Sequence, residues 1–523
     1  MQDDDFSTFW HNNEQASALF YGLLARADQD AYDDDFLMQL AAYRKAGGDA
    51  AHADIFAAQY LLANGDAESA VICGERAFRL RAVEPAVWAV LRHAYTATAR
   101  YADALVMQAY TAKLLNRPLT LPTDIPRSAL TPEVLDRLSV AMGKPSYAPM
   151  ALSRMSWEAE KGLCATEGVF AGEFIPATDV HRPPYYVATY TEQEQQGNKA
   201  WLLQTIQSAE GFSFNVGGEF VYDIIRANRA PGRAEIHCAG ENVLPIIGVT
   251  PFQRLHIKTQ SLAQDTPLNP ATPNFFRLTE DASLSSDRDF LVGTPISIGH
   301  DPMRRPLVLN ILADALPWAI LREHFAEWMP NTARFFAQGT IFDQHFSVSE
   351  YTYPSLPTIE TGMYPHHSQI FNDKFAIPLA VDIITLSERL HDLGYATTNL
   401  MGDGIGIYNG ATRGHDRLLV AGYRLLAYEG VERTIRHLEG LGDSDQFIFL
   451  HTADLHPWPY PLFQITSSVQ ARLPLTERLS GAEGSTPSPY LRATPLSATA
   501  CIQGIRDLDR ALGTLFSYLE QHY

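Results

Sequence analysis

The apolar run Leu307–Ala313 (L-V-L-N-I-L-A) constrains the fold of this chain most, because it ends abruptly at the acidic residue Asp314. A short, continuous apolar run is typical of a central parallel strand that is buried on both faces. Helical and strand-like patterns alternate after it, with strands predicted at Ala396–Met401 and 447–450 and a long helix at 497–521. This alternation predicts a layered α/β/α sandwich, in which ligands bind at the carboxyl ends of the strands.

The 523 residues are too many for one hydrophobic core, and we expect three regions. Residues 1–140 are rich in Ala and Leu and poor in Pro and Gly, which predicts helices. Residues 145–300 contain short apolar runs separated by Gly and Pro, which predicts a β-rich domain, in the form of a sandwich. Residues 305–523 carry the α/β pattern, including two further helices predicted at 324–337 and 383–393.

Two segments of the N-terminal region are similar at a spacing of roughly 34 residues, the tetratricopeptide period. The first includes Tyr60 and Ala67, and the second includes Trp88, Tyr95 and Ala102. The small residues allow paired helices to approach closely, while the aromatic rings fill the space between them. The pattern resembles a tetratricopeptide pair, whose concave face would bind a peptide or a partner protein. An ordinary helical bundle is the alternative.

The formal net charge of −20 argues against nucleic acid or an anionic membrane as the main partner. An acidic enzyme that acts on an anionic ester needs positive charge in its site, and a bound divalent cation is the simplest source. No run of about 18 apolar residues occurs, so no transmembrane helix is expected. The N-terminal residues lack the features of a signal peptide, and we therefore expect a cytoplasmic protein. The scattered cysteines predict buried free thiols: Cys73, Cys164, Cys238 and Cys501.

A second constraint is the segment 352–365, T-Y-P-S-L-P-T-I-E-T-G-M-Y-P, which begins 38 residues after Asp314. Pro354 suits the first turn of a helix, so the hydroxyl of Thr352 is predicted at a helix N-terminus. There the helix stabilises an anion, and a cation bound by Asp314 would lower the pKa of the hydroxyl. The alternatives are a turn in which Thr352 is only a cap, and an Asp314 that caps the following helix.

Together these segments resemble the alkaline phosphatase and sulfatase superfamily, which transfers phosphoryl or sulfuryl groups. The run that ends at Asp314 resembles the opening strand of sulfatases, although Ala315 stands where the family often has a second acid. Thr352 occupies the position of the Cys or Ser that sulfatases convert to formylglycine, and Leu356 replaces an arginine. The segment is more similar to the nucleotide pyrophosphatase and phosphodiesterase branch, in which Ser355 would help to hold the phosphate.

The segment 447–460, F-I-F-L-H-T-A-D-L-H-P-W-P-Y, resembles the H-T-x-x-x-H-x-P-Y loop of the same superfamily. The resemblance implies that His456 contacts the anionic substrate or protonates the leaving oxygen, with His451 as a substrate-binding residue. It also implies a divalent metal ion (Zn, Mn, Mg or Ca). Its expected ligands are Asp314, Thr352 and Asp454.

Two departures from the family pattern weaken the metal prediction. The family's G-K-W-H-x-G is replaced by a Gly-rich stretch around Asp403, which is a turn residue or an alternative ligand. Its metal-binding Asp-His-Gly does not occur, so we expect an incomplete domain, truncated before the last metal-binding strand, or a lost metal site.

Three functions follow from this pattern. The first is a metal-dependent hydrolase or transferase of phosphate esters through a covalent Thr352 intermediate. The second is a catalytically degenerate scaffold that binds partners through its helical repeats. The third is a sulfatase that works without formylglycine.

Overall fold

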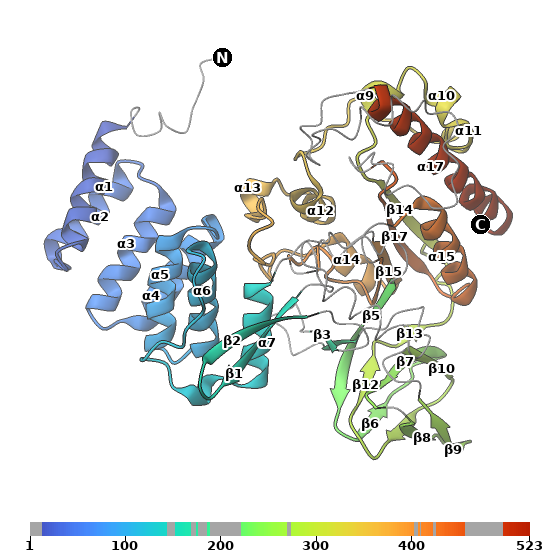
Figure 1. Cartoon of the computed structure of the whole chain (residues 1–523), viewed down its shortest axis with the longest axis horizontal. Coiled ribbons are helices and arrows are strands. Elements are labelled where there is room, and N and C mark those ends of the chain that lie inside the picture. Colours follow the sequence, from blue (N-terminus) through green and yellow to red (C-terminus); the bar gives the residue numbers. More distant parts are fainter. Residues whose placement is uncertain are drawn as a thin grey trace. The chain divides into compact units, whose positions relative to one another are not determined.

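The computed structural model (Figure 1) describes residues 13–143, 152–168, 174–175, 186–188, 221–250, 252–268, 273–401, 406–407, 409–421, 425–455 and 495–523. The chain forms two compact units. The helical unit combines the N-terminal region with residues 152–167 and 363–382, and the sheet unit contains 168–362 and 383–523. No helix in the described ranges is both long and apolar enough to cross a lipid bilayer.

The helical unit confirms the helices predicted for residues 1–140. Side-chain oxygens of Asn13, Asp33, Asp49 and Asp66 accept hydrogen bonds from backbone N–H groups and so begin four of the helices. A two-stranded sheet of β1 (Leu152–Glu158) and β2 (Gly162–Gly168) follows them. The helices are α1 (Glu14–Ala27), α2 (Asp34–Lys45), α3 (Ala50–Ala63), α4 (Ala67–Leu80), α5 (Pro85–Ala97), α6 (Tyr101–Leu114) and α7 (Pro132–Met142).

The sheet unit is organised around a mixed sheet whose strand order is β10-β7-β12-β5-β16-β15-β17-β14. The last four strands of this order are parallel to one another, whereas β5 pairs antiparallel with β16. The strands are β5 (Val221–Ala230), β7 (Asn242–Gly248), β10 (Pro273–Leu278), β12 (Phe290–Gly293), β14 (Leu307–Ala313), β15 (Ala396–Met401), β16 (Arg417–Ala421) and β17 (Gln446–Thr452). Three short strands join this sheet at its side, β3 (Phe174–Ile175), β4 (Tyr186–Ala188) and β13 (Ile296–Ser297).

A second sheet has the order β6-β11-β8-β9, and it packs on the antiparallel part of the first. Leu244 of β7, Leu255 of β8, Leu284 of β11 and Phe290 of β12 share one buried core. The β-rich character predicted for residues 145–300 is therefore present in the described strands. This β-rich region is not a separate domain, however, because its first sheet continues into the parallel strands. The second sheet consists of β6 (Arg233–Ile236), β8 (Arg254–Lys258), β9 (Ala263–Pro267) and β11 (Ala282–Ser285).

The parallel strands are covered on both faces, which makes three layers (Figure 1). Leu309 and Ile448 belong to the core shared with α15 (Ala427–Gly440) and α17 (Pro495–His522). Val308 and Phe447 point to the opposite core, which contains side chains of α12 (Thr352–Thr361) and α14 (Leu386–Asp392). This alternation with a period of two is the ordinary consequence of strand geometry.

Three sequence predictions need correction. In the described part of the chain β14 pairs only with β17, so it is an edge strand with half-buried residues instead of a central, fully buried one. The helix predicted at 324–337 is broken before Pro330 into α10 (Phe325–Trp328) and α11 (Pro330–Phe336), because proline lacks the N–H that would continue the first helix. The cysteines are free, as predicted, but are partly exposed and not buried.

Candidate active site

Asp314 and His451 lie at the same edge of the sheet because their strands are neighbours. In β14 and β17, Leu312 is paired with His451, and the backbone N–H of Asp314 donates to the carbonyl of Thr452 at 3.0 Å. The period of two places both side chains on the face that α12 covers. The imidazole Nε2 of His451 lies 3.2 Å from Oδ2 of Asp314. Their side chains are only 4% and 19% exposed, so water screens this pair weakly.

Thr352 is the first residue of α12, and its hydroxyl donates to Oδ2 of Asp314 at 3.0 Å. One carboxylate oxygen thus contacts both the hydroxyl of Thr352 and the imidazole of His451. The hydroxyl stands at the N-terminus of α12, where the helix dipole favours negative charge. The sequence analysis expected Thr352, as nucleophile, to lie beside Asp314, as metal ligand, and the two side chains are in contact.

The position of α12 follows from its own sequence. Tyr351 is in an extended conformation, and the helix ends at Gly362, which has a left-handed φ of 69°. Pro357 lies inside the helix, where its ring leaves the carbonyl of Tyr353 without the usual helical donor. The side-chain amide of Asn409 donates to this carbonyl at 3.4 Å. A tertiary contact therefore supports a helix that Pro357 would otherwise weaken.

Ser355 and Asp454 have different surroundings from those expected. The hydroxyl of Ser355 donates to the carbonyl of Tyr351 at 3.0 Å, which uses its hydrogen within the helix. Both carboxylate oxygens of Asp454 accept from the backbone N–H of Ala427, at 3.0 and 3.2 Å, at the start of α15. Desolvation raises the pKa of Asp454 to about 6, and these hydrogen bonds oppose the shift. The described role of Asp454 is thus to cap α15.

The remaining predicted site residues are placed as follows. His456 and Asp403 lie outside the described residues. Ala315, which follows Asp314, adopts a left-handed φ of 60°. This conformation is unfavourable for a residue with a Cβ atom, so the turn after β14 holds strain next to the candidate site.

The sequence analysis missed a buried polar cluster behind α12. Glu360 is 4% exposed, and its Oε2 accepts from the backbone N–H and the hydroxyl of Ser387, at 3.0 and 2.5 Å. The same hydroxyl lies 2.9 Å from Nε2 of His415. These contacts connect the end of α12 to the start of α14. The sequence signal for this cluster was Glu360 itself, a single charged residue in the otherwise uncharged stretch T-I-E-T.

The described residues do not by themselves make a metal site. Within these ranges no group of three or more His, Cys, Asp and Glu side chains could hold a metal ion. Asp314 and His451 contribute two such ligands, and the hydroxyl of Thr352 adds a weak third. A hard cation prefers about six oxygen ligands, and catalytic zinc normally has three protein ligands. The donor set seen here is therefore too small for the expected cation.

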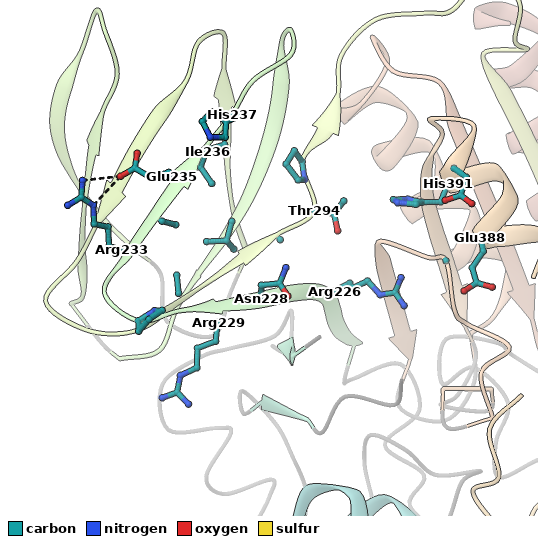
Figure 2. Close-up of a pocket in the computed structure, with 18 of the residues that line it drawn as sticks. Arg226, Asn228, Arg229, Arg233, Glu235, Ile236, His237, Thr294, Glu388 and His391 are labelled. Carbon is teal, nitrogen blue, oxygen red and sulfur yellow. Dashed lines mark hydrogen bonds and ion pairs between the residues drawn. The ribbon is translucent and has the colours of Figure 1, made fainter. Parts of the chain in front are cut away.

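A cavity of about 740 Å³ lies elsewhere in the sheet unit, between strands β5, β6 and β12 and helix α14 (Figure 2). Its lining contains both signs of charge. Arg233 pairs with Glu235 at 3.0 Å, and His391, which Figure 2 shows on the opposite side, pairs with Asp416 at 3.3 Å. Because these pairs are already formed and no candidate nucleophile lines the cavity, it is not the catalytic site that the motifs predict.

Comparison with known proteins agrees with the motifs. Residues 306–523 match the family model named Sulfatase. The C-terminal part of the chain therefore carries a sulfatase-like domain, which supports the superfamily predicted from the sequence. The comparison with curated protein sequences found no match.

Two solved structures are similar to parts of the chain. One is a Bacteroides fragilis protein provisionally named as the sulfatase YidJ, with 14% identity, a TM-score of 0.28, and coverage of 43% of this chain and 60% of that one. The other was solved in complex with its substrate D-Glucosamine-2-N, 6-O-disulfate, with 15% identity, a TM-score of 0.26, and coverage of 42% and 55%. The chain thus spans less than two thirds of either structure, and likenesses this weak carry no argument about function.

Proposed function

We propose that the sulfatase-like domain is a hydrolase or transferase of phosphate (or sulfate) esters in which Thr352 is the nucleophile. The observation that carries the proposal is the hydrogen bond from the hydroxyl of Thr352 to Asp314 at the N-terminus of α12. An anionic ester would approach the same helix N-terminus, where the helix dipole favours negative charge.

In the proposed reaction, Oγ1 of Thr352 attacks the phosphorus or sulfur atom and passes its proton to Oδ2 of Asp314. The bond to the leaving oxygen breaks, and His456 is the proposed donor of the proton that this oxygen takes up. Water, or an acceptor alcohol, then attacks the covalent intermediate and gives its proton to His456. The bond to Oγ1 of Thr352 breaks, and the proton on Asp314 returns to this oxygen. His451 holds the Asp314 carboxylate in place throughout.

Phosphate esters are favoured over sulfate esters by two features of α12. A threonine cannot be converted to formylglycine as the Cys or Ser of sulfatases is. Leu356, in the position of the missing arginine, is only 5% exposed and packs in the core with Phe449. No cation from this position can therefore bind a sulfate.

A divalent cation remains part of the proposal, because the sulfatase family generally depends on one, with Asp314 and Thr352 as its expected ligands. When bound, it would supply the positive charge that an acidic protein otherwise lacks for an anionic substrate. Dialysis against EDTA, followed by readdition of Zn²⁺, Mn²⁺, Mg²⁺ or Ca²⁺, tests this dependence.

The test of the nucleophile compares hydrolysis of an aryl phosphodiester and an aryl sulfate by the full chain and by three variants. Thr352→Ala should lower kcat by at least about 10³-fold, since removal of a nucleophile commonly has effects of this size or larger. Thr352→Ser should retain part of the activity. Thr358→Ala removes another hydroxyl of α12, which bonds to the carbonyl of Pro354, and should leave kcat nearly unchanged. Equal rates for the wild type and Thr352→Ala would end the proposal.

The second candidate function is a non-catalytic scaffold, and the small donor set at Asp314 favours it. In this reading the α3–α6 hairpins are tetratricopeptide-like and bind a partner protein. Metal analysis of the purified protein separates the two candidates, because a scaffold should contain no stoichiometric divalent ion and should show no turnover of either ester. The cytoplasmic location is likewise a proposal, which cell fractionation tests.

A further inference from the structure

The segment 363–382, here named the anchored segment, belongs to the helical unit although the chain on both sides of it belongs to the sheet unit. It follows directly after Gly362, the residue that ends the Thr352 helix. Its own short helix α13 (Pro365–Ser368) is only one turn long. The position of this segment therefore depends mainly on what it contacts.

The anchored segment is part of the hydrophobic core of the helical unit. Phe375 and Ile377 are each 4% exposed and share a core with Trp88 and Tyr110. The ring of Phe375 lies 5.3 Å from that of Trp88 and 6.2 Å from that of Tyr110, centroid to centroid. The hydroxyl of Tyr110 donates to the carbonyl of Ala376 at 3.1 Å, in a fully buried bond. These contacts come from both helices of the α5–α6 hairpin.

Polar contacts add to this apolar anchoring. Nζ of Lys113 lies 6.0 Å above the ring of Phe375, within the range of a cation–π interaction. At the end of the segment, Asp382 forms an ion pair with Arg79 of α4 at 3.4 Å. This pair is exposed and contributes little on its own. The buried ring and the buried hydrogen bond of Tyr110 therefore carry most of the attachment.

We propose that the α5–α6 hairpin is an intramolecular docking site, whose ligand is the anchored segment of the same chain, and that docking fixes the end of the Thr352 helix. The helix has only ten residues and contains Pro357, so it is marginal without tertiary support. Because Met363 follows Gly362 directly, the docked segment restrains the backbone that continues from the C-terminal end of α12. The α5–α6 hairpin thus binds a segment of its own chain.

The test is hydrogen exchange of the full chain, followed by mass spectrometry of peptides that cover residues 352–382. Tyr110→Phe removes the donor to the Ala376 carbonyl and leaves that buried group unsatisfied. We expect amides of the anchored segment and of the end of α12 to exchange about tenfold faster, since local opening becomes easier by the loss of one buried hydrogen bond. Phe375→Ala should have a larger effect in the same peptides.

Tyr43→Phe is the matched control, because the Tyr43 hydroxyl accepts from the backbone N–H of Asp49 at 2.9 Å in a different core of the same unit. It should leave the exchange of the anchored segment unchanged. Unchanged protection of residues 363–382 in both Tyr110→Phe and Phe375→Ala would overturn the proposal. An equal increase in exchange across helices α1–α6 and the anchored segment would also overturn the proposal, because the substitution would then have destabilised the whole helical unit.

A second readout, which depends on the proposed function, is ester turnover. Tyr110→Phe should lower kcat, because the C-terminal end of the Thr352 helix is then less restrained. Tyr43→Phe should leave kcat unchanged. Because exchange needs no catalysis, accelerated exchange in a chain without turnover would support the docking site and count against the catalytic proposal. The two proposals can therefore fail separately.

Discussion

Protonation of the buried His437 should make the sheet unit less stable in mildly acidic solution. His437 lies on α15 with 7% exposure, and its Nε2 is 3.0 Å from the hydroxyl of Thr398 on β15. Desolvation, with a smaller contribution from the Arg417 charge, lowers its pKa from 6.5 to about 3. Between these two values the unfolded chain binds a proton that the folded chain does not. The stability associated with this group is therefore intact above pH 6.5 and is lost as the pH falls towards 3.

The size of the effect follows from the width of this window. One pKa unit corresponds to about 1.4 kcal/mol, so at pH 5 the folded state should have lost about 2 kcal/mol relative to pH 7 through this residue. Urea unfolding at both pH values, for the wild type and His437→Gln, isolates the contribution. The glutamine can still accept from Thr398 but cannot gain a charge. We expect the pH-dependent loss of unfolding free energy to be about 2 kcal/mol smaller in the variant.

His391 provides a control of opposite sign. Its hydrogen bond to Asp416 raises its pKa above 6.5 in the folded state. Its contribution to the free energy of unfolding is therefore present at low pH and is lost as the pH rises through the folded pKa. His391→Gln should therefore increase the relative loss on acidification. If His437→Gln and the wild type lose the same free energy between pH 7 and pH 5, the argument from burial is wrong.

Two further predictions concern the support of the candidate site. Glu360→Ala should lower the unfolding free energy by about 3 kcal/mol, because it leaves the buried N–H and hydroxyl of Ser387 without their acceptor; a loss below about 1 kcal/mol in urea unfolding would contradict this. Ala315→Gly should be neutral or slightly stabilising, whereas Ala315→Val should cost about 2 kcal/mol, because a β-branched side chain tolerates a left-handed φ poorly. Thermal unfolding of the Ala315→Gly and Ala315→Val variants shows which is more stable. Equal melting temperatures would mean that the backbone at this position is not strained.

Much of the local structure could be predicted because it depends on neighbours in the sequence. The apolar run before Asp314 and the run around Phe447 are strands, and the 28-residue helix α17 has the predicted apolar face. The strand end at Asp314 and the helix start at Thr352 are each marked by a few local residues, whereas their contact was expected from the resemblance to the superfamily. Hydrophobic periodicity and proline position carry such information without reference to the rest of the chain.

The long-range features were decided only by the tertiary structure. Strand β5 pairs with β16, so that Asp223 binds Arg417 although they are 194 residues apart. The same holds for the hydrogen bonds of Asp454, the predicted metal ligand, to the backbone N–H of Ala427 at the start of α15. It also holds for the anchored segment, whose Phe375 has no local pattern that points to the core of the helical unit. Such contacts depend on which surfaces remain uncovered after local structure has formed, and burying those surfaces is a property of the whole fold.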